Sequence, residues 1–556
     1  MSPGPLLCHL GDRAMLLGRV LAGPFVWRNQ RRHPKNFPLQ RRGVVYGRPL
    51  LVRTTGQRLV VGLSNEPALR PSTEESVQAQ LAVEIVEAAP SAGRTVTLES
   101  PESAVARLLV PRAAEVEING SSGVRTRTRL SPFRLHPVSL TAGERVTVTS
   151  KRLIYSARPI PTQQARETSR DCVVLLFIDG LVTPETVAEC MPEHREVFEP
   201  IRRCAGDGLY LANHFANAEW TLASYPTVLT GLYQSSHGLF HPTVEHAVCA
   251  QSAPLGEALA AAGYLTSTIG GNPRTVPSYG VHRGFQQQYF RQFMSAGEVF
   301  TRAWRTLDDF PDRRHALLLQ VMDLHHADPH DRVEYRVVAD GPDTQRSERK
   351  SPFRIGSRAS REAYLARLRR VLPEIERFVD GVRRRFERPA ILIWTDHGDA
   401  AFGADGYPLS DARIHVPAWM IGGREQGSIA AMTENVDLYR LVLETAGASF
   451  PSSPIDSRPI ASSAAERRAA YSESRYPGQP YRGRLRAPGG EVRLESAELV
   501  AENGWIDPAT IWITSRSGTT RQLRLHGGSE LPPSDGEALA YAREVAARWL
   551  PAEAQR

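Results

Sequence analysis

The chain of 556 residues is too long for one ordinary hydrophobic core, so we expect two or three domains. Hydrophobic residues make up 41% and charged residues 23%, proportions typical of globular proteins that exclude a largely disordered chain. No stretch approaches the ~18 to 20 uninterrupted apolar residues of a membrane span, and Asp12, Arg13 and Arg19 interrupt the apolar N-terminal segment, which argues against a signal peptide. We therefore expect a cytoplasmic protein with no transmembrane segment.

The positive charge is concentrated at the N-terminus. Residues 1–60 contain 11 Lys or Arg and a single acid, whereas the whole chain has a net charge of +8. We predict a basic N-terminal arm over residues 1–42 that could bind an anionic polymer. A solvated arm, or one that packs on acidic residues of the catalytic domain, is an equal alternative, and no nucleic-acid-binding motif is present.

Residues 43–158 form short β-branched segments separated by Gly, Pro, Ser and Asn, such as "QRLVVGLS", "GRTVTLES" and "GERVTVTSKRLIYSA". This pattern predicts an antiparallel β-sandwich, an accessory domain for binding or spacing, with a linker over 158–170.

The pattern changes to alternating buried strands and helices over residues 171–450. "CVVLLFIDG", "LTSTIGG", "HALLLQVMDLHH" and "PAILIWTDHGD" each contain an apolar run typical of a strand buried on both faces, and helical segments lie between them. Such alternation predicts a doubly wound α/β domain. Residues 451–556 predict a small C-terminal α+β subdomain, and the polar stretch 328–360 predicts a surface insertion.

Acids and histidines follow three of the predicted strands, where the loops of such domains gather ligand-binding groups. They are Asp179; Asp323 with His325 and His326; and Asp396 with His397. Mixed carboxylate and imidazole ligands are typical of Zn²⁺ or Mn²⁺, so we expect one or two divalent ions.

"WTLASYPTVLTGLYQSSHG" supplies a hydroxyl, that of Thr221, at the start of an apolar helical run. We expect Ser224 to be the N-cap and Pro226 to lie in the first turn, so that the helix N-terminus would favour an anion there. The alternative is that Thr221 and Ser224 only cap a helix.

Taken together, these segments resemble the sulfatase-like branch of the alkaline phosphatase superfamily, over about residues 172–480 and in the family's order. "VVLLFIDGL" resembles its first metal-binding strand, "WTLASYPTVLTG" its nucleophile helix, "VMDLHH" its Asp-x-His segment, "IWTDHGD" its Asp-His-Gly metal segment, and "RIHVPAWMIGG" its strand with a basic residue before Val-Pro. The resemblance implies an alkaline phosphatase-like catalytic fold with Thr221 as the nucleophile.

The resemblance also implies roles for the other residues. One metal would be held by Asp179, Asp396, His397 and the Thr221 oxygen. Asp323, His325 and His415 would form a second metal site or contact the substrate anion, His326 competes with His325, and Ser224 and His326 are candidate substrate-binding residues. His237 is expected to support the loop under Thr221.

Departures from the family pattern refine the expected chemistry. Thr221 cannot become the formylglycine of true sulfatases, the Lys that commonly precedes the basic Val-Pro strand is missing, and Asp179-Gly180 replaces a pair of Asp. These features favour a metal-dependent hydrolase or transferase of a phosphate ester or phosphodiester, on a small or glycan-linked substrate. The alternatives are a sulfatase that acts without formylglycine and an inactive relative that binds an anionic glycan.

Overall fold

The computed structural model describes the chain in these residues: 40–41, 44–45, 50–54, 57–63, 82–325, 357–460, 470–499, 511–515 and 520–523, with short gaps at 122, 133, 165–166, 240–247, 249–250, 273, 292–293, 404–406, 476–478 and 488–489. The basic arm over 1–42 and the insertion over 328–360 therefore lie almost wholly outside the described residues.

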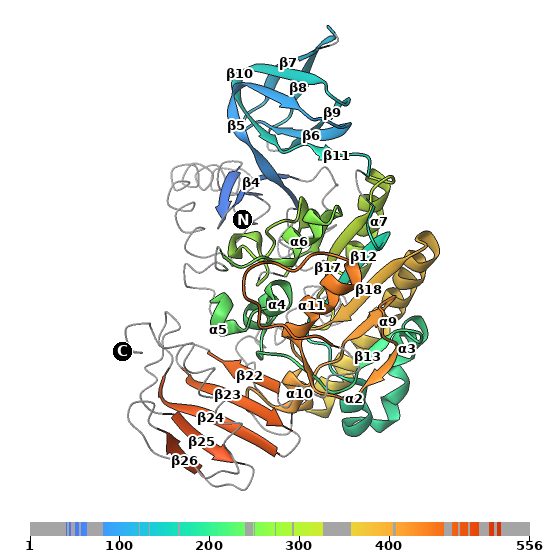
Figure 1. Cartoon of the computed structure of the whole chain (residues 1–556), viewed down its shortest axis with the longest axis vertical. Coiled ribbons are helices and arrows are strands. Elements are labelled where there is room, and N and C mark those ends of the chain that lie inside the picture. The colour runs from blue at the N-terminus through green and yellow to red at the C-terminus, as the bar shows by residue number, and fades with distance from the viewer. Residues whose placement is uncertain are drawn as a thin grey trace, which may run out of the picture.

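A mixed sheet forms the centre of the molecule (Figure 1). Strand β12 (Cys172–Ile178) lies between β17 (His315–Val321) and β18 (Pro389–Trp394) and is parallel to both. Beyond β17 follow the parallel strands β15 (Leu265–Gly270) and β16 (Gln287–Phe290). Beyond β18 follow β19 (Trp419–Ile421), antiparallel to it, then β13 (Leu209–Leu211) and β20 (Gly427–Ile429). The predicted α/β core is confirmed.

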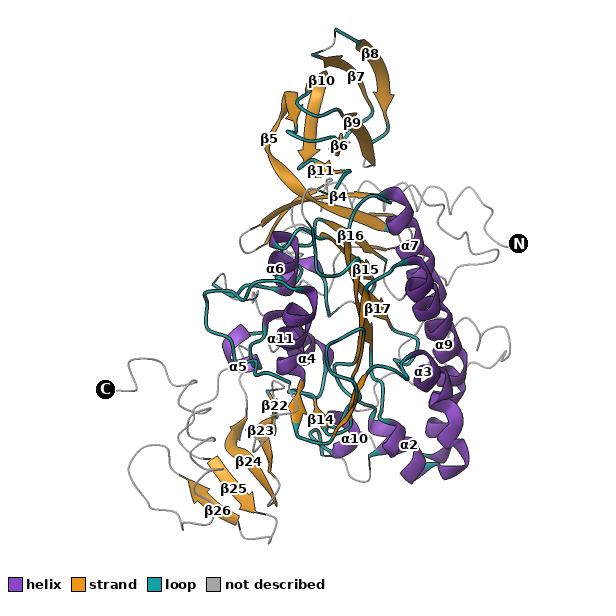
Figure 2. Ribbon diagram, turned by 45° about the vertical axis from the view of Figure 1, so that its right-hand side comes forward, coloured by secondary structure: helices purple, strands orange, loops and turns teal. Residues whose placement is uncertain are grey.

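Helices cover both faces of this sheet (Figure 2). One face carries α2 (Pro184–Cys190), α3 (Glu199–Cys204), α7 (Ala296–Asp309) and α9 (Arg358–Arg385). The other carries α4 (Thr221–Thr230), α5 (Gln234–His237), α6 (Leu255–Ala261) and α11 (Asn435–Ala446).

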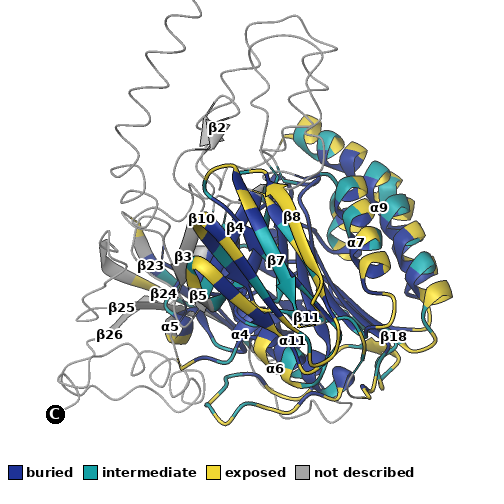
Figure 3. Ribbon diagram, turned by 90° about the horizontal axis from the view of Figure 1, so that it is seen from above, coloured by how far each residue is buried: buried dark blue, intermediate teal, exposed yellow. Residues whose placement is uncertain are grey.

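The side chains of β12 explain the two layers. Cys172, Val174 and Leu176 belong to the core beneath α7 and α9, and the intervening Val173 and Leu175 belong to the core beneath α4, α6 and α11. Successive strand residues point to opposite faces, so an uninterrupted apolar run serves both layers. Figure 3 shows the complementary pattern on α9, whose outward positions are exposed while its inner face is buried.

The N-terminal strands extend the central sheet instead of standing apart from it. Strand β5 (Val83–Glu99) pairs with β16 through its first residues, and β4 (Gln57–Leu63) and β3 (Leu50–Thr54) follow outward. The distal half of β5 joins β6 (Ala104–Leu109), β7 (Ala114–Gly120), β8 (Arg125–Leu130), β9 (Leu135–Leu140), β10 (Arg145–Ala157) and β11 (Ile160–Pro161) in an antiparallel module with its own apolar core. A self-contained β-sandwich over 43–158 stays a prediction, since β5 belongs to both parts.

The C-terminal residues include a five-stranded antiparallel sheet: β22 (Ala470–Ser474), β23 (Pro480–Ala487), β24 (Gly490–Leu499), β25 (Ile511–Ser515) and β26 (Thr520–Leu523). Strand β22 contacts the segment that enters α4, because Ser474 donates a hydrogen bond to Glu219 and the Glu473 amide donates to the Asn217 carbonyl. This sheet therefore borders the start of α4. In the described part of the chain, no helix combines the length and the apolar character that a membrane crossing needs.

Candidate metal centre at the carboxyl ends of the central strands

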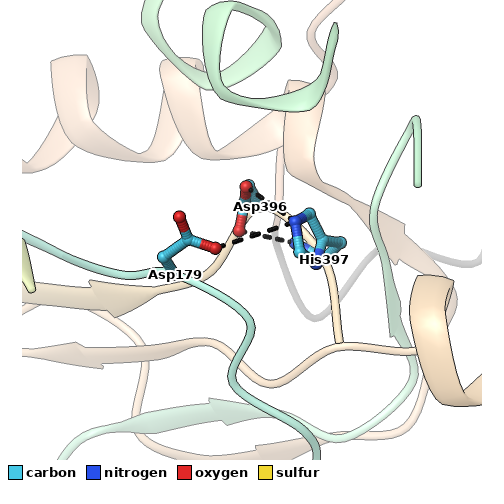
Figure 4. A group of neighbouring side chains, drawn as sticks. All are labelled: Asp179, Asp396 and His397. Carbon is cyan, nitrogen blue, oxygen red and sulfur yellow. Dashed lines mark hydrogen bonds and ion pairs between the residues drawn. The ribbon is translucent and has the colours of Figure 1, made fainter. Parts of the chain in front are cut away.

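Two neighbouring parallel strands bring acidic residues together. Asp179 follows β12 and Asp396 follows β18, and the carboxyl ends of parallel neighbours meet at one edge of the sheet. His397 completes the cluster (Figure 4): its Nε2 atom lies 3.3 Å from Asp396 Oδ2 and 3.7 Å from Asp179 Oδ1. Gly180 has a φ of 74°, a left-handed conformation that turns the chain away immediately after Asp179.

The three side chains point unsatisfied atoms at one another. Asp179 Oδ1 and Asp396 Oδ2 are buried and have no hydrogen-bond partner. His397 Nδ1 lies 2.7 Å from the Gly398 carbonyl, which can only accept, so Nδ1 carries the hydrogen and the Nε2 lone pair faces the carboxylates. Two carboxylate oxygens and one imidazole nitrogen fit a divalent cation such as Zn²⁺ or Mn²⁺.

The electrostatics of the cluster also favour a cation. Burial raises the pKa of Asp179 well above its usual range, and the charge of Asp396 raises it further. Burial lowers the pKa of His397, so the imidazole is neutral and available as a ligand. The guanidinium of Arg413, which is buried, is the cation that lowers the pKa of Asp179 most strongly. A bound divalent ion would offset the remaining negative charge.

Thr221 lies at the cluster, as the first residue of α4. An interaction with its side chain lowers the pKa of Asp179. The N-cap is Trp220, which makes no side-chain capping bond. The expectation that Ser224 is the N-cap is wrong: it lies inside the helix and donates to the Asp396 carbonyl at 2.6 Å. Pro226 is likewise within the helix and not in its first turn.

The remaining predicted ligands do not join this cluster. Asp323 Oδ2 accepts the Ala296 amide at the start of α7, at 2.8 Å. His415 Nε2 lies 3.0 Å from the Ala212 carbonyl, and its ring packs on Phe215. Among the described residues, the one group with metal-holding geometry contains neither of them, nor His325. His326 lies outside the described residues, so a second ion site stays a prediction.

Three other residues near the cluster have defined partners. His237 Nε2 lies 3.0 Å from the Ala223 carbonyl in the first half of α4, as expected for a residue that supports this segment. Sequence reasoning missed Asn272, whose amide nitrogen lies 2.6 Å from Asp179 Oδ2, and Arg413, two residues before His415. The motif "RIHVP" did signal a basic residue, but the structure directs Arg413 and not His415 toward the acids.

Comparison with known proteins places the central part of the chain in a family. The sulfatase family model matches residues 172–448. No curated protein matches the sequence. Similar solved structures include a phosphonate monoester hydrolase from Silicibacter pomeroyi, at 16% identity and a TM-score of 0.47 over 68% of this chain and 94% of that one. A 2-O GAG sulfatase has 13% identity and a TM-score of 0.45 over 68% and 91%, respectively. The lipoteichoic acid synthase LtaP from Listeria monocytogenes has 13% identity and a TM-score of 0.44 over 69% and 92%. The family model confirms the predicted resemblance for this part of the chain: residues 172–448 form a sulfatase family domain.

Proposed function

We propose that the protein is a metal-dependent hydrolase or transferase of a phosphate ester or phosphodiester, with Thr221 as the nucleophile. The superfamily contains hydrolases and transferases of phosphate and sulfate esters. The observation that carries the narrower proposal is that Thr221 lies beside Asp179, whose pKa its side chain lowers, at a buried carboxylate and imidazole cluster.

Asp179, Asp396 and His397 would hold the ion, with the Thr221 oxygen as a further ligand. When bound, a divalent cation lowers the pKa of a nearby hydroxyl and offsets negative charge on a phosphoryl oxygen. The two orphaned carboxylate oxygens and the free Nε2 lone pair support this assignment, because each needs a positive or hydrogen-bonding partner.

The position of Thr221 suits nucleophilic attack. Its oxygen would form a bond to phosphorus while the ester bond to the leaving alcohol breaks, and that alcohol departs with a proton. The Asp179 carboxylate, with which the Thr221 side chain interacts, would accept the hydroxyl proton. Thr221 begins a helix of 10 residues, so the amides of the first turn and the helix dipole would favour the phosphoryl anion.

Attack by water on the phospho-threonine would then restore the hydroxyl and release phosphate, or a phosphate monoester when the substrate is a diester, whereas attack by an acceptor alcohol would complete a transfer. A phosphate ester is favoured over a sulfate ester because threonine cannot provide the aldehyde of formylglycine.

The test compares wild type with Thr221→Ala and Thr221→Ser, each with Zn²⁺ or Mn²⁺, on aryl phosphate monoester, phosphodiester and sulfate ester substrates. We expect phosphoester hydrolysis by wild type, a loss of at least ~10³-fold in Thr221→Ala and partial activity in Thr221→Ser, which keeps a hydroxyl. Intact-mass measurement after rapid acid quench should detect a phosphate adduct on wild type and none on Thr221→Ala.

A matched control is Thr230→Ser at the other end of α4, where the hydroxyl donates to the Pro226 carbonyl and not to the cluster. This variant should retain activity. Equal phosphoester activity in wild type and Thr221→Ala would refute the nucleophile assignment, and turnover of the sulfate ester alone would support the sulfatase alternative.

A further inference from the structure

The loop after β15 makes a direct contact with the proposed metal centre. Asn272, 1% exposed, places its Nδ2 atom 2.6 Å from Asp179 Oδ2. The other oxygen, Oδ1, is the one that faces His397. One oxygen of this carboxylate therefore binds the Asn272 amide, and the other faces the metal cluster.

Neighbouring contacts fix which way the Asn272 amide points. Its Oδ1 atom accepts the Arg274 amide at 2.8 Å, so the amide oxygen is committed to this turn and Nδ2 must face Asp179. The Asn272 carbonyl accepts the backbone amide of Thr275 at 3.0 Å, a bond that does not depend on the side chain of residue 275. The side chain is thus held before any ion or substrate arrives.

Asn272 also connects the metal centre with the helix that carries Thr221. Its backbone amide donates to Gln320 Oε1 at 3.4 Å, and Gln320 Nε2 donates to the Tyr225 hydroxyl, in α4, at 2.9 Å. Gly270 makes room for this connection, since a Cβ there would lie 2.4 Å from the Cβ of Gln320. Arg274, in the same turn, makes a cation–π contact with Trp220, its guanidinium lying 5.7 Å from the ring centroid.

We propose that Asn272 is a positioning residue for the metal centre: it binds one oxygen of Asp179 and so directs the other oxygen at the ion. The inference rests on the proposed function, because it assigns Asn272 to the same ion site. An N–H donor at Oδ2 fixes the rotation of the carboxylate, so that Oδ1 stays directed at the ion. Residues that hydrogen-bond to a metal ligand commonly orient it in this way. Without that donor, the carboxylate could rotate and its Oδ2 atom would be buried without a partner.

The test measures Zn²⁺ and Mn²⁺ affinity by chelator competition and calorimetry in wild type, Asn272→Leu and Asn272→Ser. Leu has the same number and branching of side-chain heavy atoms as Asn but no donor, and the Ser hydroxyl is too short to reach the Nδ2 position. Both variants should bind the ions about 10- to 100-fold more weakly. Having two variants keeps the test valid if one of them does not fold.

Thr275→Val is the matched control, because it removes a side-chain hydrogen bond from the same turn and leaves the Asp179 contact intact. It should bind metal within threefold of wild type. Unfolding of the metal-free proteins should show that the variants compared are folded.

Asn272 variants with wild-type affinity, or a Thr275→Val variant weakened as much as they are, would overturn the inference. Asp396→Asn separates this failure from failure of the proposed function. If wild type binds metal and Asp396→Asn does not, wild-type affinity in the Asn272 variants overturns the role of Asn272 alone. If wild type binds neither ion, the metal centre is refuted and the role of Asn272 with it.

Discussion

Replacing Asp396 by Asn should stabilise the metal-free protein while abolishing its stabilisation by metal. Asp396 Oδ1 accepts the His397 amide at 2.9 Å and the Gly180 amide at 3.4 Å, and an amide oxygen in the variant can accept both. The new Nδ2 group would take the place of Oδ2, 3.3 Å from His397 Nε2, and could donate to its lone pair.

The magnitude follows from two changes. The substitution removes a buried negative charge that raises the pKa of Asp179, and it satisfies an oxygen position that has no partner. A buried polar group without a partner costs about 1–3 kcal/mol, so we expect the free energy of unfolding in chelator to rise by about that amount. In wild type, metal at 100 times its dissociation constant adds about 2.7 kcal/mol, and in Asp396→Asn it should add close to zero.

Urea unfolding of wild type and Asp396→Asn at pH 7, in EDTA and in Zn²⁺ or Mn²⁺, measures both effects. The control is Asp171→Asn: Asp171 is also buried, but its carboxylate accepts from the Arg388 amide and forms ion pairs with Arg314 and Arg388, so this variant should lose stability in both conditions. An Asp396→Asn variant that is less stable than wild type in EDTA, or equally stabilised by metal, would refute the reasoning.

Three further predictions concern the surroundings of the cluster. Burial lowers the pKa of His237 to about 3, so this residue stays neutral in the native state at pH values where the unfolded chain is protonated. The unfolded chain takes up this proton below pH ~6.5, so stability is lost as the pH falls below that value. In His237→Asn, the slope of unfolding free energy against pH between 4 and 6, from urea titrations, should decrease by about 1.4 kcal/mol per pH unit; an unchanged slope would contradict this. In Gly398→Ala, the new Cβ would lie 2.1 Å from the Ala412 carbonyl oxygen, so we expect a loss of about 1–3 kcal/mol in urea and weaker metal binding; wild-type values in both would show that the loop can shift freely. Arg413→Met leaves the buried acids without the guanidinium and should cost about 3–5 kcal/mol in EDTA by urea unfolding, and a cost below ~1 kcal/mol would mean that Arg413 does not compensate them.

The sequence by itself determined the central sheet and the position of its acids. An apolar run such as "CVVLLFI" can be a strand only if both of its faces are covered, and the strand β12 is buried throughout. Because parallel strands of one sheet end at the same edge, the sequence predicts that Asp179 and Asp396 lie at that edge together. Their position at one edge follows from strand direction, which the alternation of strands and helices indicates, and their contact follows from the pairing of β12 with β18.

Only the tertiary structure decided which side chains accompany these acids. Asn272 follows a strand of the same sheet, but its contact with Asp179 depends on the turn that commits its amide oxygen to Arg274. Arg413 and His415 are two residues apart, and the short helix α10 (Asp411–Ile414) decides which of them faces the cluster. The pairing of β5 with β16 likewise depends on an open sheet edge, which local sequence cannot specify. Strand direction can be predicted from the local sequence. The orientation of a loop side chain and the strand that pairs with a sheet edge depend on residues far apart in the chain.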